Sequence, residues 1–278
     1  MEEITISGSG ISAIVGGSNN VIESINPLSS ADFSAIIGGG TGNNIKHGVL
    51  SAIMGGGNND ILHSDYAFLG GGTDNKISGS DAEYSTIVGG EDNTIDHGRH
   101  SAILGGQEHT VNVAFSSIAG GRRNKIVHPT DNTNSFNFIG GGLGNHISGS
   151  SLYSSMLGTQ NSKIDASVNS SIAGGRENKI EQSNYSLLGG GNENAISQSR
   201  ASVLLGGQFN IIRGYPSGHG IDSIGNFLGG GQVNQLMASS YAFIGGGGSG
   251  SLKGKSDYSA IVGGLSNEIS SSEYSAIL

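Results

Sequence analysis

Pairs of glycines recur along this chain at a nearly constant interval, and this repeat limits the possible folds more than any other feature. If the first Gly of each pair marks a unit, fifteen units precede the start of a sixteenth. Most intervals are 15 to 18 residues, and 16 is the commonest. Paired-helix repeats need about 33 to 47 residues, and each Gly inside a helix would cost roughly 1 kcal/mol. The repeat therefore predicts a solenoid of short strands. The reference glycines are Gly16, Gly38, Gly55, Gly71, Gly89, Gly105, Gly120, Gly141, Gly158, Gly174, Gly190, Gly206, Gly230, Gly246 and Gly263.

Composition agrees with a repeated small core. Gly makes up 51 of 278 residues, only 35% are hydrophobic and Trp is absent, so one large core of bulky side chains is not expected. A collagen helix is excluded because Gly does not occupy every third residue. Disorder is excluded because Ile, Leu and Val are regularly spaced. The predicted fold is an all-β parallel β-solenoid (a β-roll or β-helix) of about sixteen 16-residue coils, one domain over residues 1–278.

Two aliphatic columns are expected to fill this solenoid. Ile, Leu or Met stands two residues before every reference Gly, in the series Ile14, Ile36, Ile53, Leu69, Ile87 and onward to Ile277. Ile, Leu or Val stands six residues after it, in the series Ile22, Ile45, Ile61 and onward to Ile269, if one inserted residue is allowed at Thr41-Gly42. Coils stacked about 4.8 Å apart turn such positions into continuous ladders.

An Asn column accompanies them, four residues after the reference Gly in twelve of fifteen units. It shares a strand face with the second aliphatic column, so a ladder of amide hydrogen bonds between coils is expected rather than a ligand site. The exceptions are His109, Ser162 and Gly250. The ladder residues are Asn20, Asn43, Asn59, Asn75, Asn93, Asn124, Asn145, Asn178, Asn194, Asn210, Asn234 and Asn267.

An aromatic column lies five residues before the reference Gly in ten units. It is predicted to share the outward face of the first strand with the mostly apolar position just before the Gly. Phe at the intermediate position (Phe68, Phe138, Phe227, Phe243) is always followed two residues later by Gly, which indicates a fixed volume and hence packing against other copies. A monomer with a solvated aromatic stripe is the alternative. The column comprises Phe33, Tyr66, Tyr84, Phe115, Phe136, Tyr153, Tyr185, Tyr241, Tyr258 and Tyr274, and its tyrosines Tyr66, Tyr84, Tyr153, Tyr185, Tyr241 and Tyr258 are the predicted oligomer face.

Three insertions, at residues 23–32, 127–135 and 213–223, contain all three prolines of the chain. Each follows the second aliphatic position, so all are expected along one edge. Loops on a rigid scaffold are common binding elements, although insertions without a ligand are the simpler explanation. The candidate contact residues are Tyr215, His219, Asp222, His128, Asp131 and Asn132. Tyr can stack on a sugar ring, while Asp and Asn can bond its hydroxyls.

Other chemistry is weakly indicated, and the sequence predicts neither an enzyme nor a cofactor. The chain contains no Cys, and of the turn histidines only His47 and His63 belong to adjacent units, so no metal site is predicted. A glycan-degrading spike would need two carboxylates roughly 5 to 9.5 Å apart. Asp74 with Glu91, or Glu177 with Glu193, are the pairs to consider, and solvated turn charges explain them equally well.

The motif Tyr-Ser-x-Ile-x-Gly-Gly-x-x-Asn-x-Ile, as in Tyr84 to Ile95 and Tyr258 to Ile269, resembles the repeats of YadA-like adhesin heads and of Gly-rich phage and viral tail fibres. The resemblance covers the whole chain, although this unit is longer than the usual adhesin repeat. It implies a homotrimeric, extracellular rod on a virion or cell surface that presents receptor-binding surfaces to a host glycan or protein. A fibre-borne glycan-degrading spike and a monomeric scaffold are the alternatives.

Charge and hydropathy limit the partners. The net charge of −9 argues against nucleic acid, and no apolar run approaches the ~20 residues of a membrane span. Neither is therefore expected as a partner. No secretory signal is recognised at the start, and the last residues form half of a unit, so a piece of a longer fibre protein is expected.

Overall fold

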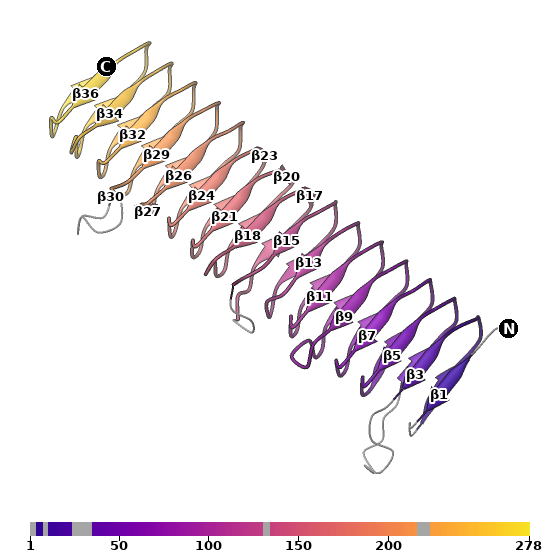
Figure 1. The fold of residues 1–278 in the computed structure, drawn as a ribbon. Helices are drawn as coiled ribbons and strands as arrows, with labels where there is room; N and C mark the ends of the chain where they lie inside the picture. Colours follow the sequence, from indigo (N-terminus) through magenta and orange to yellow (C-terminus); the bar gives the residue numbers. More distant parts are fainter. Residues whose placement is uncertain (1–3, 8–10, 24–34, 130–133, 216–222) are drawn as a thin grey trace. The chain divides into compact units, whose positions relative to one another are not determined.

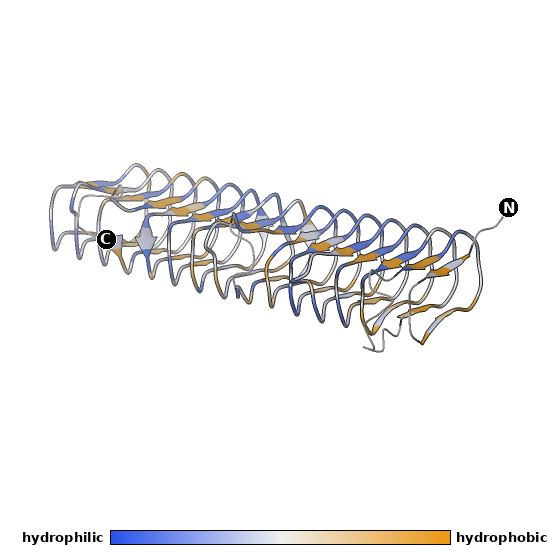
Figure 2. Ribbon diagram, turned by 60° about the horizontal axis from the view of Figure 1, so that its bottom comes forward, coloured by the Kyte–Doolittle hydropathy of each residue, from blue (hydrophilic) through white to orange (hydrophobic). Residues whose placement is uncertain are grey.

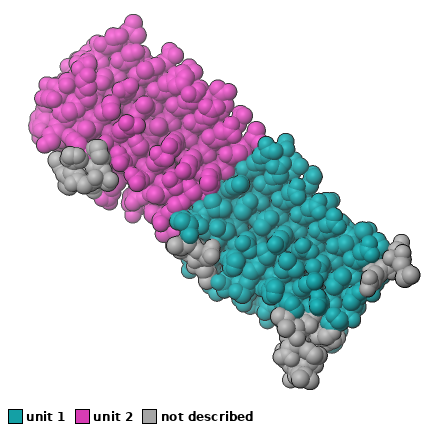
Figure 3. All heavy atoms as spheres, in the orientation of Figure 1, with its two compact units in different colours: residues 1–141 teal, residues 142–278 magenta. Residues whose placement is uncertain are grey.

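The computed structural model describes residues 4–7, 11–23, 35–129, 134–215 and 223–278. The chain divides into two compact units, Met1–Gly141 and Gly142–Leu278 (Figure 3). Each unit is a parallel β-solenoid, which confirms the predicted fold, and the described residues contain no helix (Figure 1). Every coil contributes one strand to sheet A, after the Asn position, and one to sheet B, before the Gly pair.

In the first unit, each sheet has eight strands. Sheet A consists of β1 (Thr5–Ser7), β3 (Val21–Glu23), β5 (Asn44–Lys46), β7 (Asp60–Leu62), β9 (Lys76–Ser78), β11 (Thr94–Asp96), β13 (Thr110–Val111) and β15 (Lys125–Ile126). Sheet B consists of β2 (Ser12–Ile14), β4 (Ala35–Ile37), β6 (Ser51–Ile53), β8 (Phe68–Leu69), β10 (Thr86–Ile87), β12 (Ala102–Ile103), β14 (Ser117–Ile118) and β16 (Phe138–Ile139).

The second unit repeats this arrangement. Its sheet A consists of β18 (His146–Ser148), β21 (Lys163–Asp165), β24 (Lys179–Glu181), β26 (Ala195–Ser197), β29 (Ile211–Arg213), β32 (Gln235–Met237), β34 (Ser251–Lys253) and β36 (Glu268–Ser270). Its sheet B consists of β19 (Ser155–Met156), β22 (Ser171–Ile172), β25 (Leu187–Leu188), β28 (Val203–Leu204), β31 (Phe227–Leu228), β33 (Phe243–Ile244), β35 (Ala260–Ile261) and β37 (Ala276–Ile277). Two small corner sheets join β17 (Gly142–Leu143), β20 (Thr159–Gln160) and β23 (Gly175–Arg176), and β27 (Ser199–Arg200) with β30 (Ser223–Ile224).

The core of each unit consists of the two aliphatic columns, one from each sheet. Ile87 of sheet B pairs in register with Leu69 and Ile103, and Ile95 of sheet A pairs with Ile77 and Val111. All of these side chains are fully buried, and the apolar residues follow the strands of successive coils in Figure 2. The short strands suffice because each coil places only one aliphatic side chain per sheet into the core.

One member of the predicted column is wrong. Ile37 is fully buried and pairs with Ile14 and Ile53, whereas Ile36 is 48% exposed. The reference glycine of that coil is therefore Gly39 rather than Gly38, and Thr41-Gly42 contains no insertion. Because three glycines follow one another here, the alignment of this unit is ambiguous by one residue in the sequence. The burial of Ile37 instead of Ile36 decides which glycine is the reference.

The second glycine of the pair is required by close backbone packing. Gly72 has φ +91°, and a Cβ there would overlap the carbonyl oxygen of Gly90 on the next coil. Its backbone lies in the left-handed region, which side-chain-bearing residues rarely adopt. The Gly pair thus lets consecutive coils approach at this corner.

The aromatic column lies at a corner, not on a strand as predicted. Tyr66 and Tyr84 have φ values of 54° and 57°, and they precede β8 and β10 by two residues. Phe33, assigned to this column, lies outside the described residues. The left-handed corner directs the rings outward, so they border sheet B instead of standing on it.

The occurrence of a Gly two residues after each of these Phe residues also has an explanation within one chain. A Cβ on Gly70 would overlap the carbonyl oxygen of Val88 and would lie 3.4 Å from Cε1 of Phe68. Gly229 and Gly245 show the same relation to Phe227 and Phe243. The Phe ring covers its own glycine, so this pattern does not by itself require a second copy.

Candidate functional site

The three insertions interrupt the chain between a strand of sheet A and the next strand of sheet B. The first follows β3, the second follows β15 and the third follows β29. The candidate contacts Asp131, Asn132, His219 and Asp222 lie outside the described residues. Tyr215 and His128 are the two candidates whose positions the structure describes.

Tyr215 stands at the start of the third insertion and is partly buried. Burial raises the pKa of its phenol, and the charge of Asp257 adds to the effect. Asp257 belongs to a later coil, where its carboxylate accepts a hydrogen bond from the Ser240 amide at 2.6 Å. Tyr215 is thus a protonated phenol near a carboxylate, and its hydroxyl oxygen is buried.

His128 is buried, with 5% of its surface exposed, which is contrary to the role of a surface contact. Its amide donates to Oδ1 of Asn112 at 2.9 Å, and Asn112 Nδ2 donates back to its carbonyl at 3.3 Å. Its Nδ1 lies 3.4 Å from the hydroxyl of Ser135. His128 therefore anchors the start of the second insertion, because its backbone amide and carbonyl are both hydrogen-bonded to Asn112 of the neighbouring coil.

The Asn column forms a ladder of amides that link three coils at a time. Asn75 Nδ2 donates to the carbonyl of Gly71 in its own coil at 3.1 Å and to that of Gly90 in the next coil at 2.9 Å. Its Oδ1 accepts the amide of Asn93 at 3.1 Å. The same bonds recur at Asn20, Asn43, Asn59, Asn178, Asn194, Asn210 and Asn234. Both donors of each amide are used by the scaffold and the side chains are buried, so these residues have no free donor for a ligand.

Two serine ladders were missed by the sequence analysis. Ser51 donates to the carbonyl of Ser64 at 3.0 Å and accepts the amide of Ala67 at 3.0 Å. Ser167 similarly accepts the amide of Ser183 on the next coil at 3.0 Å. The recurrent Ser after the aromatic position was the available signal. Because Ser is common in loops of many kinds, its burial was visible only in the folded chain.

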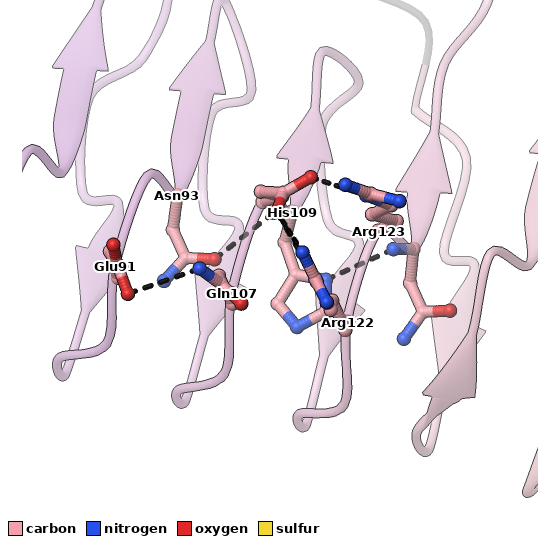
Figure 4. A network of polar contacts seen from close by, with 8 residues as sticks. Glu91, Asn93, Gln107, His109, Arg122 and Arg123 are labelled. Atoms are coloured by element: carbon pink, nitrogen blue, oxygen red, sulfur yellow. Dashed lines mark hydrogen bonds and ion pairs between the residues drawn. The ribbon is translucent and has the colours of Figure 1, made fainter.

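His109 interrupts the Asn ladder, as Figure 4 shows. Its amide donates to Oδ1 of Asn93, and its Nδ1 accepts the amide of Asn124, both at 3.1 Å. Its Nε2 is buried. Glu108, the residue before His109, forms ion pairs with Arg122 at 2.9 Å and with Arg123 at 2.5 Å. These hydrogen bonds lower the pKa of Glu108, the bond from Arg123 having the larger effect.

We expect His109 to make its part of the solenoid sensitive to acid. Burial lowers the pKa of His109 below its ordinary value of about 6.5, so the folded state binds the proton more weakly than the unfolded state. Stability is therefore complete above about pH 6.5 and falls as the pH drops towards the lowered pKa of the folded state. Hydrogen exchange of the Asn124 amide between pH 8 and pH 5, corrected for intrinsic rates, measures this loss directly.

His109→Asn is the matched variant. It restores an amide that can donate to the carbonyls on both sides, so we expect slower exchange at Asn124 and a weaker dependence on pH. If the wild-type chain and the variant lose protection equally as the pH falls, His109 is not the acid-sensitive group.

The aromatic column forms stacks of rings. Tyr66, Tyr84, His100, Phe115 and Phe136 stack in sequence, with centroid separations of 4.6 to 5.0 Å. In the second unit, Tyr258 stacks between Tyr241 and Tyr274, at 5.2 Å from each. Tyr153 and Tyr185 are 56% and 58% exposed. Sequence analysis did not include His100, which continues the stack because its ring is flat and of similar size.

The charged and histidine candidates lie at the corners and are partly or fully exposed. His47 and His63 are neighbours, with ring centroids 4.8 Å apart. Burial lowers the pKa of His47, and the charge of His63 lowers it further. Across the described ranges, no three His, Asp or Glu residues are grouped to hold a metal ion. Glu91 accepts a hydrogen bond from Gln107 at 3.1 Å, and Glu177 lies 3.7 Å from Arg176.

Two sequence comparisons, with family models and with curated proteins, give no match. Within the part of the chain that the structure describes, no helix is long and apolar enough to cross a membrane. The resemblance to adhesin and fibre repeats therefore rests on the motif quoted for it.

Proposed function

We propose that this chain is a structural segment of an extracellular fibre or adhesin, a rod built from copies of itself that presents recognition loops. The observation that carries the proposal is the outward surface of sheet B. Its side chains stand one and three residues before the reference Gly, and we call them the outer apolar face. Charged residues make up 13% of the chain, yet neither position contains one in any coil.

The apolar side chains of this face are exposed in the single chain. Met54 and Leu104 are each 54% exposed, Leu205 is 48% exposed and Val262 is 51% exposed. Sheet A differs, because Lys46, Lys76, Lys163 and Lys179 stand on its outward positions. Exposed apolar patches without charge are typical of interaction surfaces.

A second copy of the same chain is the occupant that fits this face. Within each unit the face has no charged position at any coil, so a partner with the same repeat is suited to cover it. Parallel copies related by a cyclic axis offer the same face at every coil. Three copies would also repeat each loop around one axis, and weak contacts to a host glycan or protein would gain avidity. Tyr215 is the described candidate residue at the start of one of these loops.

The solution mass tests this proposal. For the 28.1 kDa chain, we expect light scattering at two concentrations to give about three times the chain mass. Leu104→Lys with Val262→Lys places one charge per unit on the outer apolar face, and we expect this variant to be monomeric with an unchanged circular dichroism spectrum. A monomeric wild-type chain would contradict the proposal and favour a solitary scaffold.

A matched control places the same charges on sheet A. Thr94 of β11 and Gln235 of β32 stand on outward positions of that sheet. Thr94→Lys with Gln235→Lys should keep the mass of the wild-type chain. If both double variants dissociate alike, net charge rather than the outer apolar face controls assembly.

A further inference from the structure

Five tyrosines of the aromatic column have a tyrosine neighbour on a consecutive coil, Tyr66 and Tyr84 in the first unit and Tyr241, Tyr258 and Tyr274 in the second. Tyr66 and Tyr84 stack with ring centroids 4.6 Å apart and an angle of 5° between their planes. Tyr258 stacks on Tyr241 at 12° and on Tyr274 at 2°, each at 5.2 Å. All five have φ values of 53° to 57°, so their side chains start from equivalent left-handed corners and the rings of neighbours are nearly parallel.

These rings are accessible to solvent. Tyr66 and Tyr84 are 45% and 47% exposed, while Tyr241, Tyr258 and Tyr274 are 53%, 54% and 75% exposed. The corner lies beside the outer apolar face. Tyr84 and Tyr258 are each stacked between two rings and are still about half exposed. An oxidant in solution can therefore reach these rings, unlike a ring enclosed in a core.

We propose that these pairs are sites of oxidative cross-linking, in which a dityrosine bond joins consecutive coils of one chain. The oxidant is a peroxide acting through a haem peroxidase. Each phenol gives up one electron and one proton, and two neighbouring phenoxyl radicals join through the ring carbons next to their hydroxyl-bearing carbons. The hydrogen on each joined carbon then moves to the phenolic oxygen. The pair loses two hydrogen atoms in total, and these reduce one hydrogen peroxide to two water molecules.

A bond between two such tyrosines would stabilise the folded chain. The chain has no Cys and so no disulfides. A bond between Tyr66 and Tyr84 would close a loop of one coil, as a disulfide does, and would restrict the unfolded chain. The need for such reinforcement rests on the proposed function as an extracellular rod, whereas the reaction rests only on the ring geometry.

The chain contains its own control tyrosine. Tyr185 is 58% exposed and lies at the same corner with φ 58°. The column positions of the coils before and after it are Asn169 and Ala201. Tyr185 should therefore be oxidised as readily as the paired residues but should find no phenol on a neighbouring coil.

The test treats the purified chain with a haem peroxidase and limiting hydrogen peroxide. We expect dityrosine fluorescence in a product that still migrates as a single chain in denaturing electrophoresis and is lighter by two hydrogen atoms per bond. Peptide mass spectrometry should find bonds between Tyr66 and Tyr84, and between Tyr258 and Tyr241 or Tyr274. Tyr84→Phe with Tyr258→Phe keeps the rings stacked but removes a phenol from every pair, so the fluorescence should fall to background. Tyr185→Phe should leave it unchanged.

Three results would overturn the proposal: fluorescence that survives in the Tyr84→Phe, Tyr258→Phe variant, bonds that join separate chains only, or oxidation of Tyr185 without any dityrosine. Light scattering before oxidation separates this outcome from the proposed assembly. Intrachain bonds in a monomeric chain would support the cross-linking and remove the trimer. A trimer without intrachain bonds would support the proposed assembly and overturn the cross-linking.

Discussion

Ile95→Asp is expected to unfold the coils around β11 while leaving distant coils folded. Ile95 is fully buried in sheet A between Ile77 and Val111, and no described cation lies in that aliphatic column. A carboxylate there would be uncharged or unpaired, and either state costs several kcal/mol, on the order of 4 kcal/mol or more. Because each coil of a solenoid is stabilised mainly by its neighbours, the damage should be local.

Hydrogen exchange by mass spectrometry over residues 60–126 checks this result, together with the thermal melting curve. Thr94→Asp is the matched control, since Thr94 precedes Ile95 in the same strand and stands on the outward, partly exposed side. We expect this control to cost less than about 1 kcal/mol. Equal loss of protection in the two variants would refute the assignment of Ile95 to the core.

Asn75→Leu should have the second largest effect, although the two side chains have similar shapes. The substitution removes donors to the carbonyls of Gly71 and Gly90 and the acceptor for the buried amide of Asn93. A buried polar group left without a partner costs about 1 to 3 kcal/mol. We therefore expect a loss of about 3 to 5 kcal/mol in the free energy of unfolding, measured by urea denaturation, with faster exchange at the Asn93 amide.

Asn267→Leu provides the comparison for this prediction. Asn267 is partly exposed and donates to the carbonyl of Gly263 at 2.7 Å. The same substitution should cost only about 1 kcal/mol there. If the two variants were equally destabilised, the cost would come from placing Leu at this corner and not from breaking the ladder.

The architecture could be predicted because its signals are repeated. An aliphatic residue two positions before the Gly in sixteen units is not a coincidence of composition, and parallel stacking is the arrangement that buries all of them. The Asn ladder could be predicted for the same reason: an amide has two donors and an acceptor, and a column of amides can satisfy them only by bonding along the stack. Local periodicity was sufficient at these positions.

Prediction failed where neighbouring residues offered equivalent choices. Ile36 and Ile37 are chemically identical, and only the register with Ile53 shows which of them is buried. The tyrosines were assigned to a strand because spacing cannot reveal a left-handed corner, which bulky residues rarely occupy without tertiary support. His128 was taken for a contact residue, whereas it is 5% exposed and hydrogen-bonded to Asn112 of the neighbouring coil.

The sequence by itself determined the period of the coil, the aliphatic columns of the core and the amide ladder, because each of these follows from one position repeated in every unit. The tertiary structure alone decided which residues face outward at each corner, that the rings of Tyr66 and Tyr84 stack, and that His109 stands buried in the ladder. These features depend on the contact between one coil and the next. Residues in such contact are about sixteen positions apart, so their relation is set by three-dimensional register and not by any local pattern.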